Sequence, residues 1–299
     1  MSGRGLGAAG PGGAGAWIQV ALNGARGAAE GAAVPMSPQA LAQSALGAVA
    51  AGAREVLVHP RTPCGRESLS PRVVGPVLEA MRGAGVSVPL GVPVDAAAEP
   101  DPAGRLERVR SWVVLPERAV VRWAEAGARE LASALLARGV AVDMVVPLGT
   151  SGHAEGAGHA EGAGHAEGAG HAEGAGAWVA GRAGRVRLVG ELAEADPALV
   201  AGLISAPVAG PGRGREPDVE PGPLPAPGRP WSVPWLLFGR EAAAWPVLRL
   251  AARCGAGTRI GVGEVLSLPD GRPARSNAEL VAAAVREWAR AATATAASR

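Results

Sequence analysis

The sequence of 299 residues contains no lysine, no tyrosine, one phenylalanine and only two cysteines. Two cysteines are too few for a disulfide framework or a cysteine-rich metal site, so we expect free thiols in a reducing compartment. There is no run of about 18 apolar residues, and we therefore predict no membrane span. The Gly-rich stretch 1–16 lacks the apolar segment of a signal peptide. Together these absences predict a cytoplasmic protein.

The charge is also unremarkable, with every basic side chain an arginine and a formal net charge of only +2. The arginines are scattered along the chain rather than clustered. Nucleic-acid-binding domains carry basic patches or stripes, so we expect no nucleic-acid partner. Hydrophobic residues make up 48% of the chain, which is enough for one large core.

From Trp17 onward, short apolar segments alternate with segments that have helical character. The apolar segments lack a clean two-residue alternation, which is typical of parallel strands buried on both faces. Eight such units favour a closed (β/α)8 TIM barrel over an open doubly wound sheet. The predicted strands are 17–22, 55–59, 88–94, 119–123, 140–146, 185–189, 235–238 and 258–262. The predicted helices are 37–52, 70–82, 102–109, 125–138, one opening at Pro197, 242–252 and 277–291.

Two low-complexity segments interrupt this rhythm, one made of tandem repeats and one rich in Pro, Gly and Arg. Both fall inside strand–helix units rather than between domains, so we predict one domain with two inserts. The predicted boundaries are a disordered tail at 1–16, the barrel at 17–291 with inserts at 150–177 and 207–231, and a C-terminal tail at 292–299.

The first insert holds four copies of Gly-His-Ala-Glu-Gly-Ala at 152–175, which place His153, His159, His165 and His171 six residues apart. Imidazole and carboxylate groups are ligands for zinc or nickel, so one interpretation is a weak metal-binding strap. Six residues advance a helix by about 600°, and successive histidines would not share a face. The glycines also oppose a rigid ligand geometry. A flexible insert is therefore the favoured interpretation.

Several short motifs follow one another in an order and spacing that are typical of one enzyme family. The motifs are VALNGAR at 20–26, VLVHPR at 56–61, GRESL at 65–69, LLFG at 236–239, AAAWP at 242–246, TRIG at 258–261 and LPDGRP at 268–273. Through them the sequence resembles the β-keto acid cleavage enzymes, the family that includes 3-keto-5-aminohexanoate cleavage enzymes. The resemblance extends over about 17–290, apart from the two inserts.

This resemblance implies a TIM barrel, often oligomeric, that holds a divalent metal, usually zinc. It further implies acyl exchange between a β-keto acid and acetyl-CoA, which yields acetoacetate and a new CoA ester. Such chemistry needs the keto oxygen of the β-keto acid to be held on a Lewis acid, so that the developing oxyanion is neutralised. We accordingly expect small-molecule β-keto acid and acetyl-CoA partners and a homo-oligomer.

The metal-ligating positions that the resemblance implies are only partly kept. The family binds its metal with two histidines one residue apart after the second strand and a glutamate after the eighth. Here these positions hold Leu57, His59 and Gly263, with Glu264 at the neighbouring catalytic acid. Zinc sites generally need at least three protein ligands, so we expect zinc to bind weakly or not at all, with His59 as the residual ligand. Leu57→His together with Gly263→Glu is expected to restore metal binding.

Further candidate site residues follow from the same alignment. Glu264 and Arg259 are the predicted catalytic pair. Glu264 is expected to act as an acid–base or as a carboxylate ligand, with a solvated loop carboxylate as the alternative. Arg259 is expected to bind a carboxylate or phosphate group, with an ion pair to Glu264 as the alternative. Arg61 and Arg26 are predicted substrate contacts, with surface salt bridges as the alternative, and Asp143 is placed at the end of the fifth strand as a third contact. Other family positions have changed, namely Pro93 and Val94 in place of hydroxyl residues, Arg122 in place of Asn and Phe238 in place of His.

Two functions remain open at this point. The chain is either an acyl-exchanging enzyme with a remodelled metal site, or a catalytically silent member of the family that binds a ligand or another subunit. The metal content of the protein separates the two most directly.

Overall fold

The computed structural model of the protein describes residues 16–148, 174–176, 178–179, 182, 185–198 and 235–297. The four histidines and all but the last two residues of the His-containing repeat lie outside these residues, as do most of both predicted inserts and nearly all of the predicted N-terminal tail. The helix predicted to open at Pro197 also lies outside them, apart from its first two residues.

Eight parallel strands form a closed barrel in sequence order, with β1 hydrogen-bonded to both β2 and β8. Gln19 of β1, for example, lies opposite Glu55 on one side and Arg259 on the other. This confirms the predicted (β/α)8 barrel. The strands are β1 Ile18–Ala21, β2 Glu55–Leu57, β3 Leu90–Pro93, β4 Arg118–Arg122, β5 Ala141–Leu148, β6 Val186–Leu192, β7 Trp235–Phe238 and β8 Gly257–Ile260.

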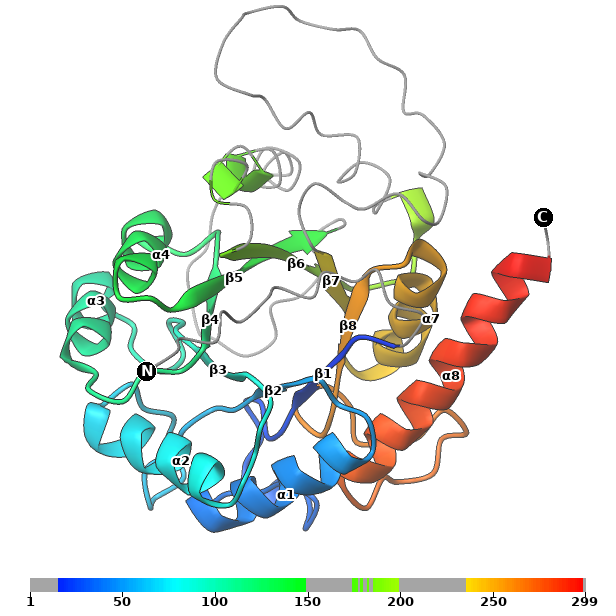
Figure 1. Cartoon of the computed structure of the whole chain (residues 1–299), viewed down its shortest axis with the longest axis horizontal. Coiled ribbons are helices and arrows are strands. Elements are labelled where there is room, and N and C mark those ends of the chain that lie inside the picture. The colour runs from blue at the N-terminus through cyan, green and yellow to red at the C-terminus, as the bar shows by residue number, and fades with distance from the viewer. Residues whose placement is uncertain are drawn as a thin grey trace, which may run out of the picture.

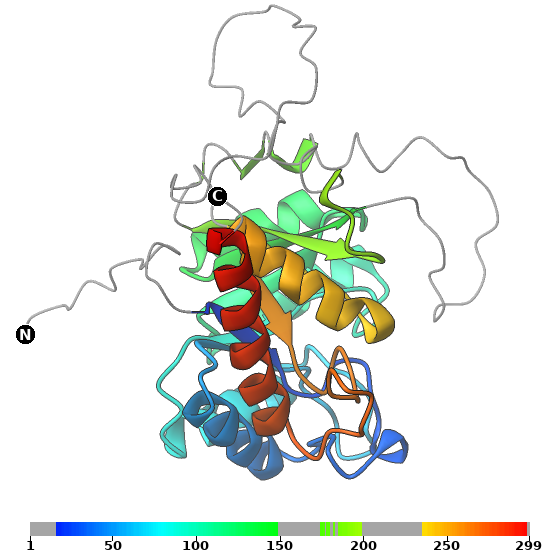
Figure 2. The same cartoon turned by 90° about the vertical axis from the view of Figure 1, so that its right-hand side faces the viewer.

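Helices surround the barrel on its outer side (Figure 1). The view turned by 90° shows α7 and α8 side by side along the outside of the strands (Figure 2), in agreement with their mutual contacts. None of the helices in the described part of the chain is long and apolar enough to cross a membrane. They are η1 Ala28–Glu30, α1 Pro38–Ala50, α2 Pro71–Gly83, α3 Pro102–Ser111, α4 Ala128–Ala137, η2 Glu241–Ala243, α7 Ala244–Cys254 and α8 Asn277–Ala297.

Helix starts follow local sequence signals closely. Each of α1, α2 and α3 begins with a proline, whose fixed φ and missing N–H suit the first helical position. The Ser37 hydroxyl accepts a hydrogen bond from the Ala40 N–H at 3.1 Å, and the Asp101 carboxylate accepts one from Gly104 at 2.9 Å. These caps satisfy backbone donors that the first helical turn leaves free.

Two elements run more than two residues further than predicted. Strand β6 continues to Leu192 because it pairs with β5 as far as Leu148, a register that only the partner strand defines. Helix α8 continues to Ala297, so the predicted tail at 292–299 is helical over most of its length. Its sequence contains no glycine or proline to end it near Ala291.

The core has two parts, one between strands and helices and one inside the barrel. Alternate residues of each strand point inward, as the two-residue period of a strand requires. The inner cluster is a buried apolar layer midway along the barrel, and it separates two polar layers. Its members are Ala21, Leu57, Val120, Val145, Val189, Leu236 and Phe238, with Trp17 packed against them.

Candidate active site

The polar layer at the carboxyl ends of the strands forms the mouth of the barrel. Each of its side chains comes from the inward-facing position at or just past a strand end, where active sites of such barrels lie. Its members are His59 after β2, Asp95 after β3, Arg122 at the end of β4, Glu191 near the end of β6, Arg240 after β7 and Glu264 after β8.

His59 is fixed through its backbone rather than its ring. Its N–H donates to Asn23 Oδ1 at 3.0 Å and its carbonyl accepts from Asn23 Nδ2 at 2.9 Å, which ties the end of β1 to the end of β2. Burial, and then the positive charges of Arg240 and three other arginines, hold the pKa of His59 well below its usual value. The ring is therefore neutral at pH 7, and its buried Nδ1 has no hydrogen-bond partner within the described residues.

Arg259 and Glu264, the predicted catalytic pair, both lie at this mouth and are only 3% exposed. Arg259 Nη1 lies 3.9 Å from Glu264 Oε1, while Arg259 Nε donates to Gln19 Oε1 at 2.7 Å. The guanidinium also lies over the ring of Phe238, 4.4 Å from its centroid. Arg259 Nη2 and Glu264 Oε2 are buried and make no hydrogen bond within the described residues, so each keeps one polar atom for a ligand.

Glu191 joins two arginines across the mouth. Arg122 Nη1 donates to one carboxylate oxygen of Glu191 and Arg240 Nε to the other, both at 2.8 Å. Arg240 Nε also lies 3.6 Å from Glu264 Oε2. Burial opposes ionisation of Glu191, but the two guanidinium groups outweigh it and lower the pKa of that carboxyl. The mouth thus carries a row of alternating charges.

Arg61 lies on the loop after β2 and is largely committed to that loop. It donates to the carbonyl oxygens of Gly65 and Gly24, both at 2.7 Å, and to Glu67 Oε1 at 3.1 Å. Burial, reinforced by the negative charge of Asp95, raises the pKa of Glu67 to about 7. Asp95 itself has a buried Oδ1 without a hydrogen-bond partner among the described residues. The loop therefore adds two acidic groups beside the mouth.

Arg26 lies at the rim, where Nε donates to the Val262 carbonyl at 2.6 Å and the terminal nitrogens pair with Glu30 and Glu241. A cavity of about 200 Å³ opens between this arginine and the mouth, lined by Ala25, Arg26, Glu30, Arg240, Glu241, Gly263 and Glu264. Ion pairing occupies Arg26, but the cavity beside it reaches Glu264.

Asp143 does not lie at the mouth, so its predicted position at the end of the fifth strand is wrong. It is the third residue of the eight-residue strand β5, below the apolar layer. Arg118 Nε donates to it at 2.7 Å, and Arg187 pairs with both Asp143 and Glu55. Gln19 Nε2 donates to Glu55 at 3.0 Å. We refer to Gln19, Glu55, Arg118, Asp143 and Arg187 as the lower network.

The residues at the implied metal positions do not fit a zinc ion. Leu57 is 1% exposed within the inner apolar cluster and offers no ligand atom. Gly263 packs against the backbone, and a Cβ added there would lie 2.8 Å from Gly24 N. No group of three or more His, Cys, Asp or Glu side chains is arranged to hold a metal among the described residues. This close backbone contact at Gly263 also argues against the expectation that Gly263→Glu, together with Leu57→His, restores metal binding.

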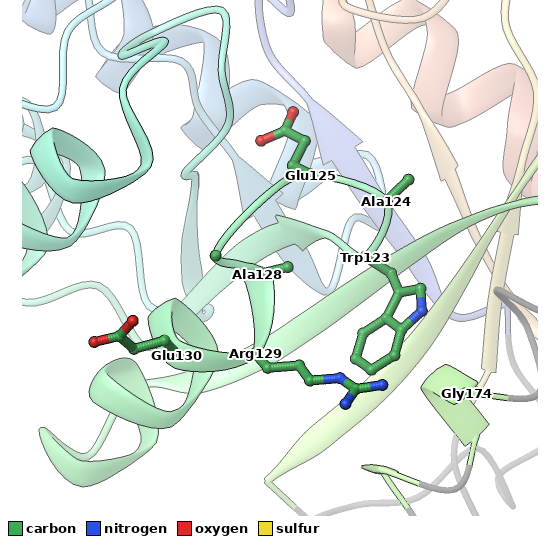
Figure 3. Close-up of a pocket in the computed structure, with 8 residues that line it drawn as sticks. Trp123, Ala124, Glu125, Ala128, Arg129, Glu130 and Gly174 are labelled. Carbon is green, nitrogen blue, oxygen red and sulfur yellow. The ribbon is translucent and has the colours of Figure 1, made fainter. Parts of the chain in front are cut away.

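A larger cavity of about 530 Å³ lies beside the mouth, between the end of β4 and the start of α4 (Figure 3). The guanidinium of Arg129 faces the ring of Trp123, 4.8 Å from its centroid, and Glu130 points away from that ring. Trp178 approaches the same tryptophan, with ring centroids 6.3 Å apart. The cavity thus offers an aromatic face and a cation to a ligand.

Sequence reasoning missed Asp95, Glu191, Arg240 and Glu67 as members of the site. Asp95 and Arg240 each lie two residues beyond the last inward-facing residue of a strand, a position that strand alternation could have indicated. Glu191 was missed because β6 was predicted to end at Val189. Glu67 carried no local signal, since only folding brings its loop next to Asp95.

The family assignment is independent of these contacts. The sequence profile of the β-keto acid cleavage enzymes matches residues 16–159 and 223–298. No curated protein matches the sequence.

Among solved structures, ObcA superposes with a TM-score of 0.52 and 13% identity over 89% of this chain, which spans 61% of the ObcA chain. A phospho-2-dehydro-3-deoxyheptonate aldolase from Thermotoga maritima superposes with a TM-score of 0.52 and 15% identity, covering 94% of this chain and 69% of that one. At these identities the likeness supports the barrel fold alone. Because the family profile covers well over half of its length, the chain belongs to the β-keto acid cleavage enzyme family.

Proposed function

We propose that the barrel mouth binds a small β-keto acid and exchanges its acyl group with acetyl-CoA, giving acetoacetate and a new CoA ester. The observation that carries this proposal is the pair of buried atoms Arg259 Nη2 and Glu264 Oε2, neither of which has a hydrogen-bond partner among the described residues. Glu264 lines the 200 Å³ cavity, and Arg259 lies directly behind it, with Nη1 3.9 Å from Glu264 Oε1. Buried polar atoms without partners are costly in a folded protein, and a polar ligand would satisfy both.

The roles of the residues follow from their chemistry. Arg259 would bind the substrate carboxylate, since a guanidinium donates to carboxylates in a fixed, planar geometry. Glu264 would move the proton, because it lines the cavity and its Oε2 has no hydrogen-bond partner among the described residues. His59, being neutral, would donate or accept a hydrogen bond rather than supply charge. Zinc would supply a Lewis acid in the family, but Leu57 and Gly263 give it no ligands here, and no step is assigned to it.

For the acetyl-CoA partner, we propose the cavity beside Trp123 as the entrance. Its aromatic face suits a purine ring, and Arg129 suits phosphate groups. Trp123, which lines this cavity, directly follows Arg122, whose guanidinium pairs with Glu191 at the mouth.

The direct test incubates the purified chain with [13C]acetyl-CoA and a panel of straight-chain, branched and amino-substituted β-keto acids. Mass spectrometry should find the label in acetoacetate and a new CoA ester in equal amount. Glu264→Gln should lower the rate by about 100-fold or more, the usual contribution of a general acid–base. Glu107→Gln, an exposed position on α3, is the matched control and should leave the rate unchanged. An equal rate in Glu264→Gln would remove Glu264 from the reaction.

A second function, ligand binding without turnover, has its own support. Leu57 and Phe238 occupy positions at which the resemblance implies histidines, and both are buried in the inner apolar cluster. Saturable binding of a β-keto acid with no label transfer from acetyl-CoA would identify the chain as a silent member of the family.

A further inference from the structure

Arg240 interacts with three charged or titratable groups of the mouth, which are Glu264, Glu191 and His59. It ion-pairs with Glu264 and Glu191, and after burial it contributes most to the low pKa of His59. By the resemblance, the family's metal would be held at the positions of His59 and Gly263, and Arg240 lines the same cavity as Gly263 and Glu264. A side chain of this protein therefore supplies a positive charge next to one of the implied ligand positions.

The hydrogen bonds of Arg240 leave most of its donors free. Its contacts with Glu191 and Glu264 both involve Nε, at 2.8 and 3.6 Å. Its terminal amino groups make no hydrogen bond within the described residues, and its side chain is 42% exposed and lines the 200 Å³ cavity. Glu264, on the same cavity, is 3% exposed and has an oxygen without a hydrogen-bond partner. A cation with free donors thus faces a space beside a buried, unsatisfied acid.

We propose that the guanidinium of Arg240 takes the place of the family's metal ion. It donates hydrogen bonds to the keto oxygen of a β-keto acid bound in this cavity and stabilises the negative charge that develops on that oxygen during the reaction. Glu191 positions the guanidinium by accepting from its Nε, and Arg122 fixes Glu191 from the other side. A guanidinium is permanently charged and presents several parallel donors, so it stabilises an oxyanion without any metal. This inference rests on the proposed function and names the group that polarises the substrate.

The test measures binding of acetoacetate to the full chain by isothermal titration calorimetry, with and without EDTA and with added zinc. The wild-type dissociation constant should be the same in all three conditions. Arg240→Gln should weaken binding roughly tenfold or more, the effect of losing a hydrogen bond to a charged group. Arg240→Lys keeps the charge and should recover part of the loss. Arg253→Gln, an exposed arginine in the last turn of α7, is the matched control and should bind as the wild type does.

Circular dichroism and thermal unfolding of each variant establish that it is folded, as expected for a partly exposed side chain. Binding that EDTA abolishes and zinc restores would overturn the inference, as would wild-type affinity in Arg240→Gln or equal losses in Arg240→Gln and Arg240→Lys. In those cases the chain still binds a keto acid and the proposed function stands. No binding of acetoacetate or of any β-keto acid of the panel by the wild type would overturn the proposed function itself.

Discussion

The two polar layers inside the barrel differ in how completely their groups are paired. In the lower network, both oxygens of Asp143 and of Glu55 accept hydrogen bonds. At the mouth and its bordering loop lie five of the six buried side-chain polar atoms that have no hydrogen-bond partner in the described part of the chain. The sixth, Arg187 Nε, belongs to a guanidinium that lies 4.3 Å from the ring centroid of Trp17.

This difference distinguishes a structural network from a binding site. A satisfied buried network fixes strand positions, and it has nothing left to offer a ligand. Burial alone would raise the pKa of Asp143, but Arg118 and Arg187 hold it below its usual value, so the lower network stays charged and paired. The mouth keeps unpaired atoms next to a cavity, which costs stability and is useful only if a ligand completes them. Arg259 connects the two layers, since it bonds Gln19 below and faces Glu264 above.

The largest expected effect is in the lower network. Asp143→Asn removes the negative charge between Arg118 and Arg187, leaving buried cations poorly paired, and should lower the free energy of unfolding by about 3–5 kcal/mol. Urea denaturation followed by tryptophan fluorescence measures this. The exposed Asp270→Asn is the control and should change nothing measurable. If Asp143→Asn lowered the free energy of unfolding by less than about 1 kcal/mol, the lower network would not be the stabilising, fully paired layer that distinguishes it from the mouth.

A smaller effect is expected from restoring the implied metal ligands. Gly263→Glu places a Cβ 2.8 Å from Gly24 N, and overpacking of this kind typically costs about 1–3 kcal/mol. Leu57→His also puts a polar ring into the apolar cluster. The double variant should therefore lose thermal stability without gaining zinc. Zinc titration should be compared with the wild type, because both carry the His repeat. A tight additional zinc ion in the double variant would contradict the packing argument.

The smallest expected effect is the contribution of Glu67 to the pH dependence of stability. The pKa of Glu67 is raised to about 7, so between its ordinary value of 4.5 and 7 the folded chain holds a proton that the unfolded chain has released. The contribution of Glu67 to stability is therefore largest below pH 4.5 and is lost as the pH rises through 7. Relative to the wild type, Glu67→Gln should become more stable as the pH increases from 5 to 8. Urea unfolding across this range tests it, with the exposed Glu79→Gln showing no such trend.

The sequence by itself determined the fold and part of the mouth. Strand–helix alternation and proline helix starts are local signals, and they predicted the eight strands of the barrel and the starts of its first helices correctly. His59 and Glu264 could be placed at the mouth because both come after a strand end, where the strand itself fixes the position of the chain. Arg259 is the third residue of β8, and its long side chain reaches Glu264.

Only the tertiary structure decided which of the inward-facing charged side chains pair with one another. Asp143 belongs to the lower network because the pairing register of β5 with β4 and β6 sets its depth in the barrel. Glu191 and Arg240 meet across 49 residues of sequence, and Gly263 is confined by a backbone more than 200 residues away in the chain. Such contacts depend on closure of the barrel, which brings distant strands together and which no local pattern encodes.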